Sequence, residues 1–131
     1  MTAWRALFIL LPALLLAGCD DARIRAMKTV KRVKPAQLRK DVARFYKNIF
    51  GPHQKTIVRV NSEIWTLAFD ELHPERITAY PDGFAFCLES NGSAESGLYI
   101  VPLGMDHVPT PTPWASYEKL HEGIYWYSFK P

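Results

Sequence analysis

The chain has 131 residues and a formal net charge of +3, and 48% of its residues are hydrophobic. This composition excludes an intrinsically disordered chain, and the length suits one domain with a modest core. The net charge conceals two segments of opposite sign. Residues 19–55 carry eleven Lys or Arg and three Asp, whereas residues 56–131 carry four Lys or Arg and ten Asp or Glu.

The first element is a short apolar run from Ala6 to Ala17, which follows a single positive charge at Arg5. A membrane-spanning helix needs about 20 apolar residues, so this run is too short to cross a bilayer and instead has the length of a secretory signal. It ends in Leu16-Ala17-Gly18-Cys19. This motif resembles the lipobox of bacterial lipoproteins at all four positions.

The resemblance covers residues 1–19. It implies cleavage after Gly18, a diacylglycerol on the Cys19 sulfur and acylation of the new amino terminus. Two or three acyl chains anchor a protein stably, whereas one does so only marginally. Asp20 after the cysteine resembles the signal that retains lipoproteins in the inner membrane of enteric bacteria. We therefore expect a lipid-anchored protein on the periplasmic face of the cell envelope, with the inner membrane favoured over the outer one; the alternative is an ordinary cleaved signal.

Residues 19–34 are polar and basic, and we expect them to be a membrane-proximal tether that orders only on contact with a partner. Anionic headgroups attract each basic residue near the surface by about 1 kcal/mol. Six cations are candidates to hold the tether against the membrane: Arg23, Arg25, Lys28, Lys31, Arg32 and Lys34. The alternative is a solvated linker that its charges keep extended. Nucleic acid is not an expected partner of a secreted lipoprotein.

An amphipathic helix is predicted over about residues 36–50. Pro35 suits the first position of a helix, and Gly51-Pro52 suits its end because Gly accepts a left-handed conformation and Pro cannot continue the helix. Four apolar residues form one stripe along it: Leu38, Val42, Phe45 and Ile49.

The following elements are shorter. Residues 56–60 favour a strand, and a short helix is predicted over roughly 63–72, capped by Asn61 or Ser62, with a strand through Trp65 as the competing prediction. Its inward stripe would be Ile64, Leu67, Ala68 and Leu72. Residues 77–80 and 84–89 predict a hairpin around Pro81-Asp82-Gly83, in which Gly83 takes a positive φ. We expect residues 90–97 to form a polar loop and residues 98–103 a third strand.

The C-terminal part begins with a proline-rich connector, residues 102–113, which we expect to be extended. A last strand, residues 123–129, carries large residues on both faces and is therefore expected to be central or covered on both sides. The predicted fold class is α+β, with an N-terminal amphipathic helix packed on a small antiparallel meander of about four or five strands. One domain would span residues 35–131, after a signal of residues 1–18 and the tether of residues 19–34.

No catalytic, cofactor or metal motif is apparent in the predicted mature part. The four histidines, His53, His73, His107 and His121, are not at ligand spacings. No serine lies on a strand-to-helix elbow, and no glycine-rich phosphate loop occurs. Cys87 lies within an apolar strand and is expected to be buried as a small hydrophobe. We therefore expect neither a cofactor nor a metal, and an enzyme is not the favoured class.

The C-terminal aromatic residues are the candidates for partner binding, because Tyr and Trp combine an apolar ring with a polar end. These residues are Trp114, Tyr117, Tyr125 and Tyr127. Trp114 is expected to be exposed, whereas Trp126 and Ile124 fit a core. The leading prediction is a non-enzymatic binding or assembly module that recognises another envelope protein. The alternatives are a small envelope hydrolase, and an inhibitor or immunity-type lipoprotein that presents loop 90–97 or 104–113 to a toxin or lytic enzyme.

Overall fold

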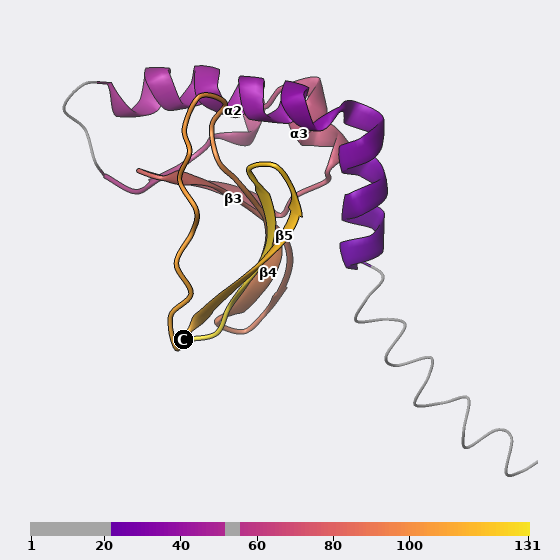
Figure 1. Ribbon diagram of the computed structural model, residues 1–131, viewed down its shortest axis with the longest axis vertical. Coiled ribbons are helices and arrows are strands. Elements are labelled where there is room, and N and C mark those ends of the chain that lie inside the picture. Colours follow the sequence, from indigo (N-terminus) through magenta and orange to yellow (C-terminus); the bar gives the residue numbers. More distant parts are fainter. Residues whose placement is uncertain (1–21, 52–55) are drawn as a thin grey trace, which may run out of the picture.

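The computed structural model describes residues 22–51 and 56–131, and within them it is an α+β fold (Figure 1). Two consecutive helices, residues 22–33 and α2 (Pro35–Phe50), precede a sheet of six antiparallel strands, and short α3 (Leu67–Glu71) lies between the first two strands. The predicted fold class is confirmed. The lipobox and Cys19 lie outside the described residues. Within the described ranges no helix has the length and apolar character needed to cross a membrane.

The strands run in the order β1-β2-β3-β4-β6-β5. Their bounds are β1 Val58–Arg59, β2 Arg76–Tyr80, β3 Gly83–Asn91, β4 Ala94–Ile100, β5 Ala115–His121 and β6 Ile124–Phe129. The first four form the predicted meander. The last two form a hairpin whose second strand, β6, pairs with β4, so the final strand is central as predicted and β5 becomes the edge.

The structure differs from the predictions in the loop 90–97, in strand β5 and in the segment 22–33. The expected loop 90–97 is a tight turn, because β3 runs to Asn91 and β4 already begins at Ala94. Strand β5 was not anticipated. The segment 22–33 is a helix rather than a tether that waits for a partner, since Ala26 and Val30 pack into the core of the domain.

Helix α2 follows its predicted pattern. Pro35 stands at its first turn, and Leu38, Val42 and Phe45 face the core. Gly51 ends the helix with φ 43°, a left-handed value that glycine accepts without a steric penalty. Helix α2 therefore packs over one face of the sheet.

The predicted helix 63–72 is split into a 3-10 turn, Ser62–Ile64, and α3. Asn61 caps the first through its side chain, as predicted, and Thr66 caps the second by accepting a hydrogen bond from the Phe69 amide. The predicted inward-facing apolar stripe of this helix is partly wrong, because Leu67 is 85% exposed and Phe69 packs in the core instead. The Phe69 ring packs between those of Phe45 and Phe86.

The β2–β3 hairpin lies at the predicted place, but Gly83 does not adopt a positive φ. A Cβ at this position would overlap the ring of Tyr99 and crowd the Ile100 carbonyl. Glycine is therefore required here for close packing rather than for a special backbone conformation.

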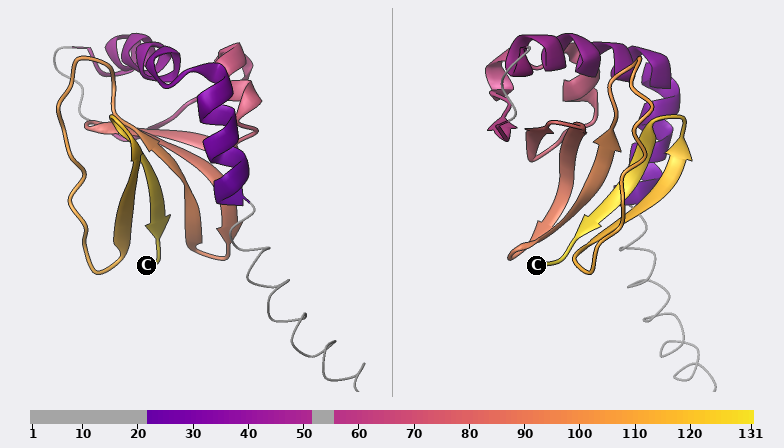
Figure 2. Two further views of the ribbon diagram at one scale, coloured as in Figure 1. Left: turned by 45° about the vertical axis from the view of Figure 1, so that its right-hand side comes forward. Right: turned by 60° about the vertical axis from the view of Figure 1, so that its left-hand side comes forward.

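Two apolar clusters lie on opposite faces of the sheet. The helices cover one face, over Phe84, Phe86 and Ile124, and the connector between β4 and β5 runs along the other (Figure 2). There Val101 and Met105 pack with the tyrosines of the second cluster. Side chains of β3 alternate between the two faces, because Phe84 and Phe86 belong to the first cluster and Ala85 to the second.

Arg39 holds the connector to α2. Its guanidinium donates hydrogen bonds to the carbonyl oxygens of Val101 (3.0 Å), Pro102 (3.2 Å) and Met105 (3.2 Å). In return, the Leu103 amide donates to the Arg39 carbonyl at 3.1 Å. The connector is therefore fixed at its first residues and reaches across the sheet before β5 begins.

Candidate functional site

A groove of about 680 Å³ opens on the connector-covered face of the sheet, where the connector ends and β5 begins. Trp114, Tyr117 and Phe129 supply its aromatic walls, and Glu95 of β4 contributes a carboxylate. The Tyr117 and Phe129 rings are perpendicular, with centroids 6.1 Å apart. The remaining lining residues are small or compact: Ser93, Thr112, Ala115 and Pro131. We call this the aromatic groove.

The backbone around Trp114 is fixed although its side chain is 62% exposed. Thr112 and Ala115 exchange two backbone hydrogen bonds, of 2.9 and 3.3 Å, across the turn that carries Trp114. The Lys130 amide donates to the Trp114 carbonyl at 2.8 Å. A large ring on an ordered turn loses little backbone entropy when a partner covers it.

The four aromatic candidates predicted from the sequence divide into two pairs. Trp114 and Tyr117 both line the aromatic groove. Tyr125 and Tyr127 are buried in the second apolar cluster and do not offer a contact surface, which corrects that part of the prediction. Side chains alternate along β6, and the sequence pattern alone could not show that the connector covers this face.

Phe129 and Glu95 are the groove residues that sequence reasoning missed. Phe129 faces Ala115 across β5 and β6, and Glu95 is its neighbour on β4. The available signal was the alternation Tyr125, Tyr127, Phe129, which places the last residue on the same face as the two tyrosines.

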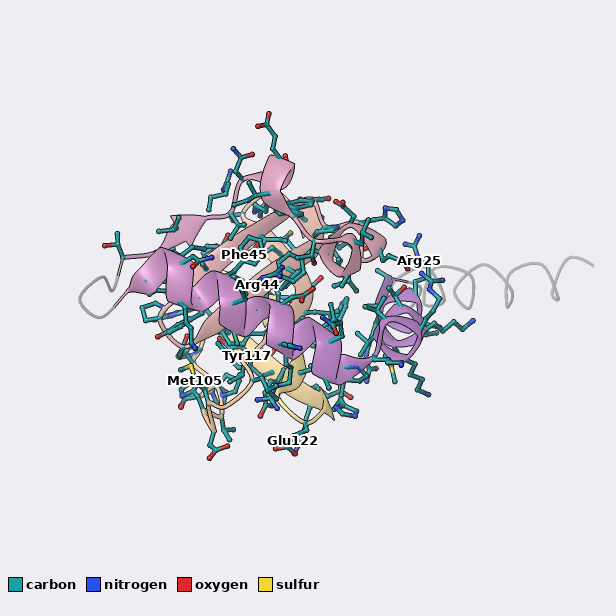
Figure 3. The ribbon with its side chains drawn as sticks, turned by 90° about the horizontal axis from the view of Figure 1, so that it is seen from above. Arg25, Arg44, Phe45, Met105, Tyr117 and Glu122 are labelled. Carbon is teal, nitrogen blue, oxygen red and sulfur yellow. The ribbon has the colours of Figure 1, made fainter. Side chains whose placement is uncertain are left out.

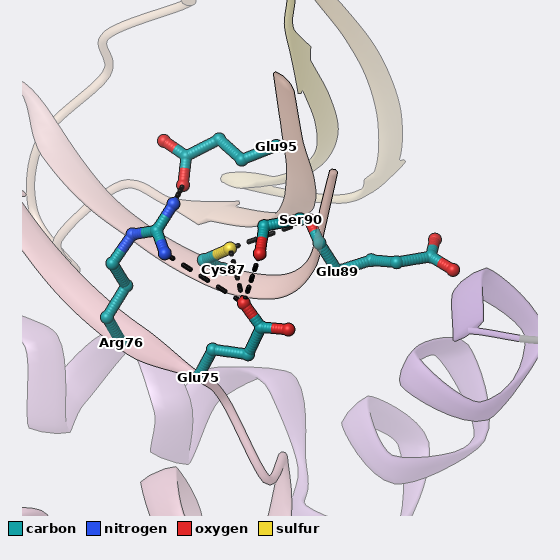
Figure 4. A network of polar contacts seen from close by, with 6 residues as sticks. All are labelled: Glu75, Arg76, Cys87, Glu89, Ser90 and Glu95. Atoms are coloured by element: carbon teal, nitrogen blue, oxygen red, sulfur yellow. Dashed lines mark hydrogen bonds and ion pairs between the residues drawn. The ribbon is translucent and has the colours of Figure 1, made fainter. Parts of the chain in front are cut away.

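A polar network borders the groove on the side of β2 (Figure 4). The Arg76 guanidinium pairs with the Glu95 carboxylate at 2.7 Å, and Ser90 donates a hydrogen bond to Glu75 at 2.6 Å. The Cys87 thiol lies 3.8 Å from the same Glu75 oxygen. Burial, followed by the hydrogen bond and charge of Glu95, raises the pKa of Cys87 to about 12. A thiol in that state is not a nucleophile near neutral pH, and the expected burial of Cys87 is confirmed.

Tyr127 lies between Gly97 of β4 and Tyr117 of β5 in the register of the sheet. Its side chain is fully buried, and its hydroxyl has no hydrogen-bond partner among the described residues. Burial also raises the pKa of Tyr127 above its ordinary value, with the charge of Glu95 as the next cause. The hydroxyl is thus neutral, and no hydrogen bond within the described part of the chain satisfies it.

One histidine does meet a carboxylate. His107 of the connector lies 3.0 Å from Asp82 in the β2–β3 turn, through Nε2 and Oδ2. The other Asp82 oxygen accepts a hydrogen bond from the Tyr99 hydroxyl. Burial, followed by this hydrogen bond to Asp82, raises the pKa of Tyr99. Neither Asp82 nor His107 lines the aromatic groove.

The six predicted basic residues lie on or directly after helix 22–33, on the other side of the molecule from Met105 of the connector (Figure 3). Arg23 pairs with Glu118 of β5, and Arg32 pairs with Glu71 at 2.7 Å. The other four, Arg25, Lys28, Lys31 and Lys34, are exposed. In residues 22–51 there are ten Lys or Arg and one acid, so the helical layer carries most of the positive charge.

Among the residues that the structure describes, no group of three His, Cys, Asp or Glu side chains is placed to hold a metal ion. Comparison of the chain with known protein families, with curated proteins and with solved structures gave no match. The site must therefore be interpreted from its own chemistry.

Proposed function

We propose that this chain is a lipid-anchored protein of the bacterial envelope that acts as a non-enzymatic binding module. Its partner, another envelope protein, would occupy the aromatic groove, while Cys19 holds the chain to the membrane. The observation that supports this most directly is the exposed Trp114 on an ordered turn beside a groove of about 680 Å³. Protein interfaces are enriched in Trp, Tyr and Phe, and a few such residues supply most of the binding energy.

The charge of the sheet indicates a second property of the proposed partner. Residues 56–131, which build the sheet and the groove, carry four basic and ten acidic residues. A partner with a basic surface around an apolar or aromatic side chain complements this layer, because opposite potentials steer association and suppress wrong partners.

Photo-cross-linking in the native envelope tests the groove. A benzophenone amino acid at position 114 is expected to capture a discrete partner, because this side chain stands at the mouth of the groove. The matched control places the same group at Leu67, the most exposed of the large apolar residues of the described part, which lies on α3. Equal capture from both positions, or capture from neither, would argue against the groove as the binding site.

Substitution then measures the contribution of the groove. Trp114→Ala is expected to weaken partner binding by at least about 2 kcal/mol, the range of interface hot spots, with no loss of fold because the side chain is exposed. Val108→Ala removes another exposed apolar side chain of the connector and serves as the control. If both substitutions have the same small effect, Trp114 is not the anchor.

The proposed lipid anchor has its own test. Changing Cys19 to Ser is expected to abolish acylation, seen as loss of labelled palmitate, and to release the chain from the membrane fraction. Normal processing and membrane association of the variant would contradict the proposal. Localisation to the inner rather than the outer membrane is read from the same fractionation.

A hydrolase is the second candidate function, and the pair of His107 with Asp82 favours it because this geometry is that of a general base with its orienting carboxylate. If the chain is a hydrolase, His107→Ala should abolish turnover of envelope substrates while leaving partner capture at position 114 intact. An inhibitor or immunity function predicts instead that the captured partner is a toxin or lytic enzyme.

A further inference from the structure

The lining of the aromatic groove carries one formal charge, and that charge is negative. Of the eight described residues around the groove, Glu95 is the one acid, and none is Lys, Arg or His. The apolar part of this lining consists of three rings with Ala115 and Pro131, and it includes no Leu, Ile, Val or Met. Aromatic rings carry partial negative charge on their faces, unlike aliphatic side chains. The groove therefore offers a cation an environment that an aliphatic groove would not.

Trp114 is the ring of the groove that lacks an aromatic neighbour. The ring of Phe129 packs against those of Tyr117 and Tyr127, with centroids 6.1 and 4.5 Å apart. In the described part of the chain, no ring pair includes Trp114 and no cation lies over its indole. The indole is therefore the ring that a charged group of a partner can reach.

The negative charge beside the groove is shared with an arginine of the chain itself. Glu95 pairs with Arg76 at 2.7 Å, and the same guanidinium lies 3.9 Å from Glu75 (Figure 4). One cation thus faces two carboxylates, so the three groups together retain one negative charge. Residues 56–131 as a whole carry ten acidic and four basic residues, a difference of six. The field of the sheet therefore attracts a cation to the groove while Arg76 keeps its pair with Glu95.

A guanidinium fits the aromatic groove better than an ammonium group does. It is planar, weakly hydrated and stacks on aromatic rings, of which tryptophan attracts cations best. The N–H groups at its edge need hydrogen-bond acceptors, and the lining provides the hydroxyls of Ser93 and Thr112. Thr112 already accepts one hydrogen bond, from the Trp114 amide at 3.3 Å, and a hydroxyl oxygen can accept a second.

From these observations we infer that the aromatic groove recognises an arginine side chain of the partner protein. The guanidinium stacks on the Trp114 indole at the mouth of the groove, and an apolar side chain beside it in the partner packs against Tyr117 and Phe129. This inference rests on the proposed function, because it names the residue by which the partner is recognised. It also separates two roles within the groove. Trp114 supplies selectivity for charge, and the inner rings supply apolar contact.

The test uses the full lipidated chain in neutral detergent micelles and two peptides of equal shape. Acetyl-Arg-Gly-Phe amide carries the guanidinium, and its citrulline counterpart replaces that group by a neutral urea. The arginine peptide is expected to shift the indole N–H resonance of Trp114 and the amide resonance of Ala115 until both saturate. The citrulline peptide is expected to bind at least about fivefold more weakly, because it lacks the charge. Equal affinities, or no saturable shift with the arginine peptide, would overturn the inference.

Two further probes test the identity of the cation. Acetyl-Lys-Gly-Phe amide is expected to bind more weakly than the arginine peptide, because an ammonium group is more strongly hydrated and does not stack. A lysine peptide that binds as tightly would overturn the choice of a guanidinium. Choline, the cationic end of a lipid headgroup, is expected to bind more weakly than the arginine peptide as well. Tighter binding of choline would replace the protein partner by a lipid.

Substitution of Trp114 shows whether the ring itself supplies the selectivity. Trp114→Leu keeps an apolar side chain and removes the aromatic face, so the preference for arginine over citrulline is expected to fall below about twofold. Val108→Ala, in the connector but outside the lining of the groove, is expected to keep the preference of the parent. If Trp114→Leu also keeps it, the field of the sheet alone selects the charge and the inference is wrong. The Ala115 amide reports binding in each variant, and circular dichroism confirms that each is folded.

These outcomes are distinct from those that test the proposed function. Cross-linking at position 114 reports whether a protein occupies the groove, whereas the titrations report which side chain the groove prefers. A discrete protein captured at position 114, together with equal affinities for the arginine and citrulline peptides, would contradict this inference and leave the binding module in place. Absence of both capture and peptide binding would contradict both proposals.

Discussion

The guanidinium of Arg39 lies directly against Gly123, so that a Cβ at residue 123 would overlap it. Arg39 belongs to α2, and Gly123 belongs to the turn between β5 and β6, with a positive φ of 69°. The arginine cannot move aside freely, because three connector carbonyls hold it. One glycine therefore allows the helical layer, the connector and the last hairpin to meet.

Gly123→Ala should destabilise the protein more than a matched substitution in another turn. Gly92 has nearly the same φ, 64°, but open space around its Cβ position, so Gly92→Ala carries only the backbone cost of about 1–2 kcal/mol. We expect Gly123→Ala to cost about 1–3 kcal/mol more, the usual range for overpacking. Urea unfolding of the two variants gives the difference. If both variants lose the same free energy of unfolding, the Arg39 side chain adjusts to the new Cβ without destabilising the protein.

Arg39→Lys should loosen the connector, because an ammonium cannot reproduce the three-carbonyl contact. Hydrogen bonds to charged groups contribute about 1.5–3 kcal/mol, and we expect a loss of that order. Amide exchange at Leu103 and Met105 should accelerate, since both amides bond within this connection. Lys40→Arg, an exposed neighbour on α2, is the control, and unchanged exchange in Arg39→Lys would refute the role of Arg39.

Tyr127→Phe should preserve or raise stability, whereas Tyr99→Phe should lower it. The Tyr127 hydroxyl is buried without a partner among the described residues, and such a group costs about 1–3 kcal/mol. The Tyr99 hydroxyl donates to Asp82, and its removal leaves that carboxylate short of a donor. Thermal unfolding of both variants tests the contrast. A Tyr127→Phe protein that melts well below the parent would imply a partner for this hydroxyl.

Cys87 should resist thiol reagents in the folded state and react on unfolding. Its pKa of about 12 exceeds the value of about 8.5 for an unfolded cysteine. The folded state therefore holds this proton more tightly, and the resulting stability is complete below about pH 8.5 and is lost as the pH rises through about 12. Between about pH 8 and about pH 10.5 the urea midpoint should fall more steeply in the parent than in Cys87→Ala. Parallel falls would disprove the raised pKa.

The elements that sequence reasoning predicted well are those with a clear apolar face. Helix α2 and the β2–β3 hairpin carry large apolar residues at the spacing of their own secondary structure, so pattern and packing agree. The sequence of strand β5 is Ala-Ser-Tyr-Glu-Lys-Leu-His. It is an edge strand with exposed polar residues, and its pairing comes from backbone hydrogen bonds that leave no apolar signal.

The helix 22–33 was missed for a related reason. Its buried stripe consists of Ala22, Ala26 and Val30, at a spacing of four, and two of these are small residues that add little to an apolar pattern. Ile24, a larger apolar residue of the same helix, is exposed. The domain therefore includes residues that the sequence assigned to a tether.

The sequence predicted some of the residues that line the aromatic groove. The proline-rich connector correctly marked Trp114 as exposed, and its neighbour Tyr117 lines the same groove. The burial of Tyr125 and Tyr127 depends on the path of the connector across the sheet, which Arg39 fixes from a distant helix. A single arginine among many in a basic segment gives no sign of such a role.

The position of β6 between β4 and β5 has a consequence for aggregation. Strand β4 completes its pairing only when residues 124–129 are in place. A variant without them would have an unpaired edge at the strand that carries Leu98 and Ile100, which are fully buried in the complete sheet. Unpaired apolar edges template aggregation. Pairing with β6 therefore protects β4 from association with other chains, and a variant that lacks residues 124–129 should aggregate rather than persist as a partial fold.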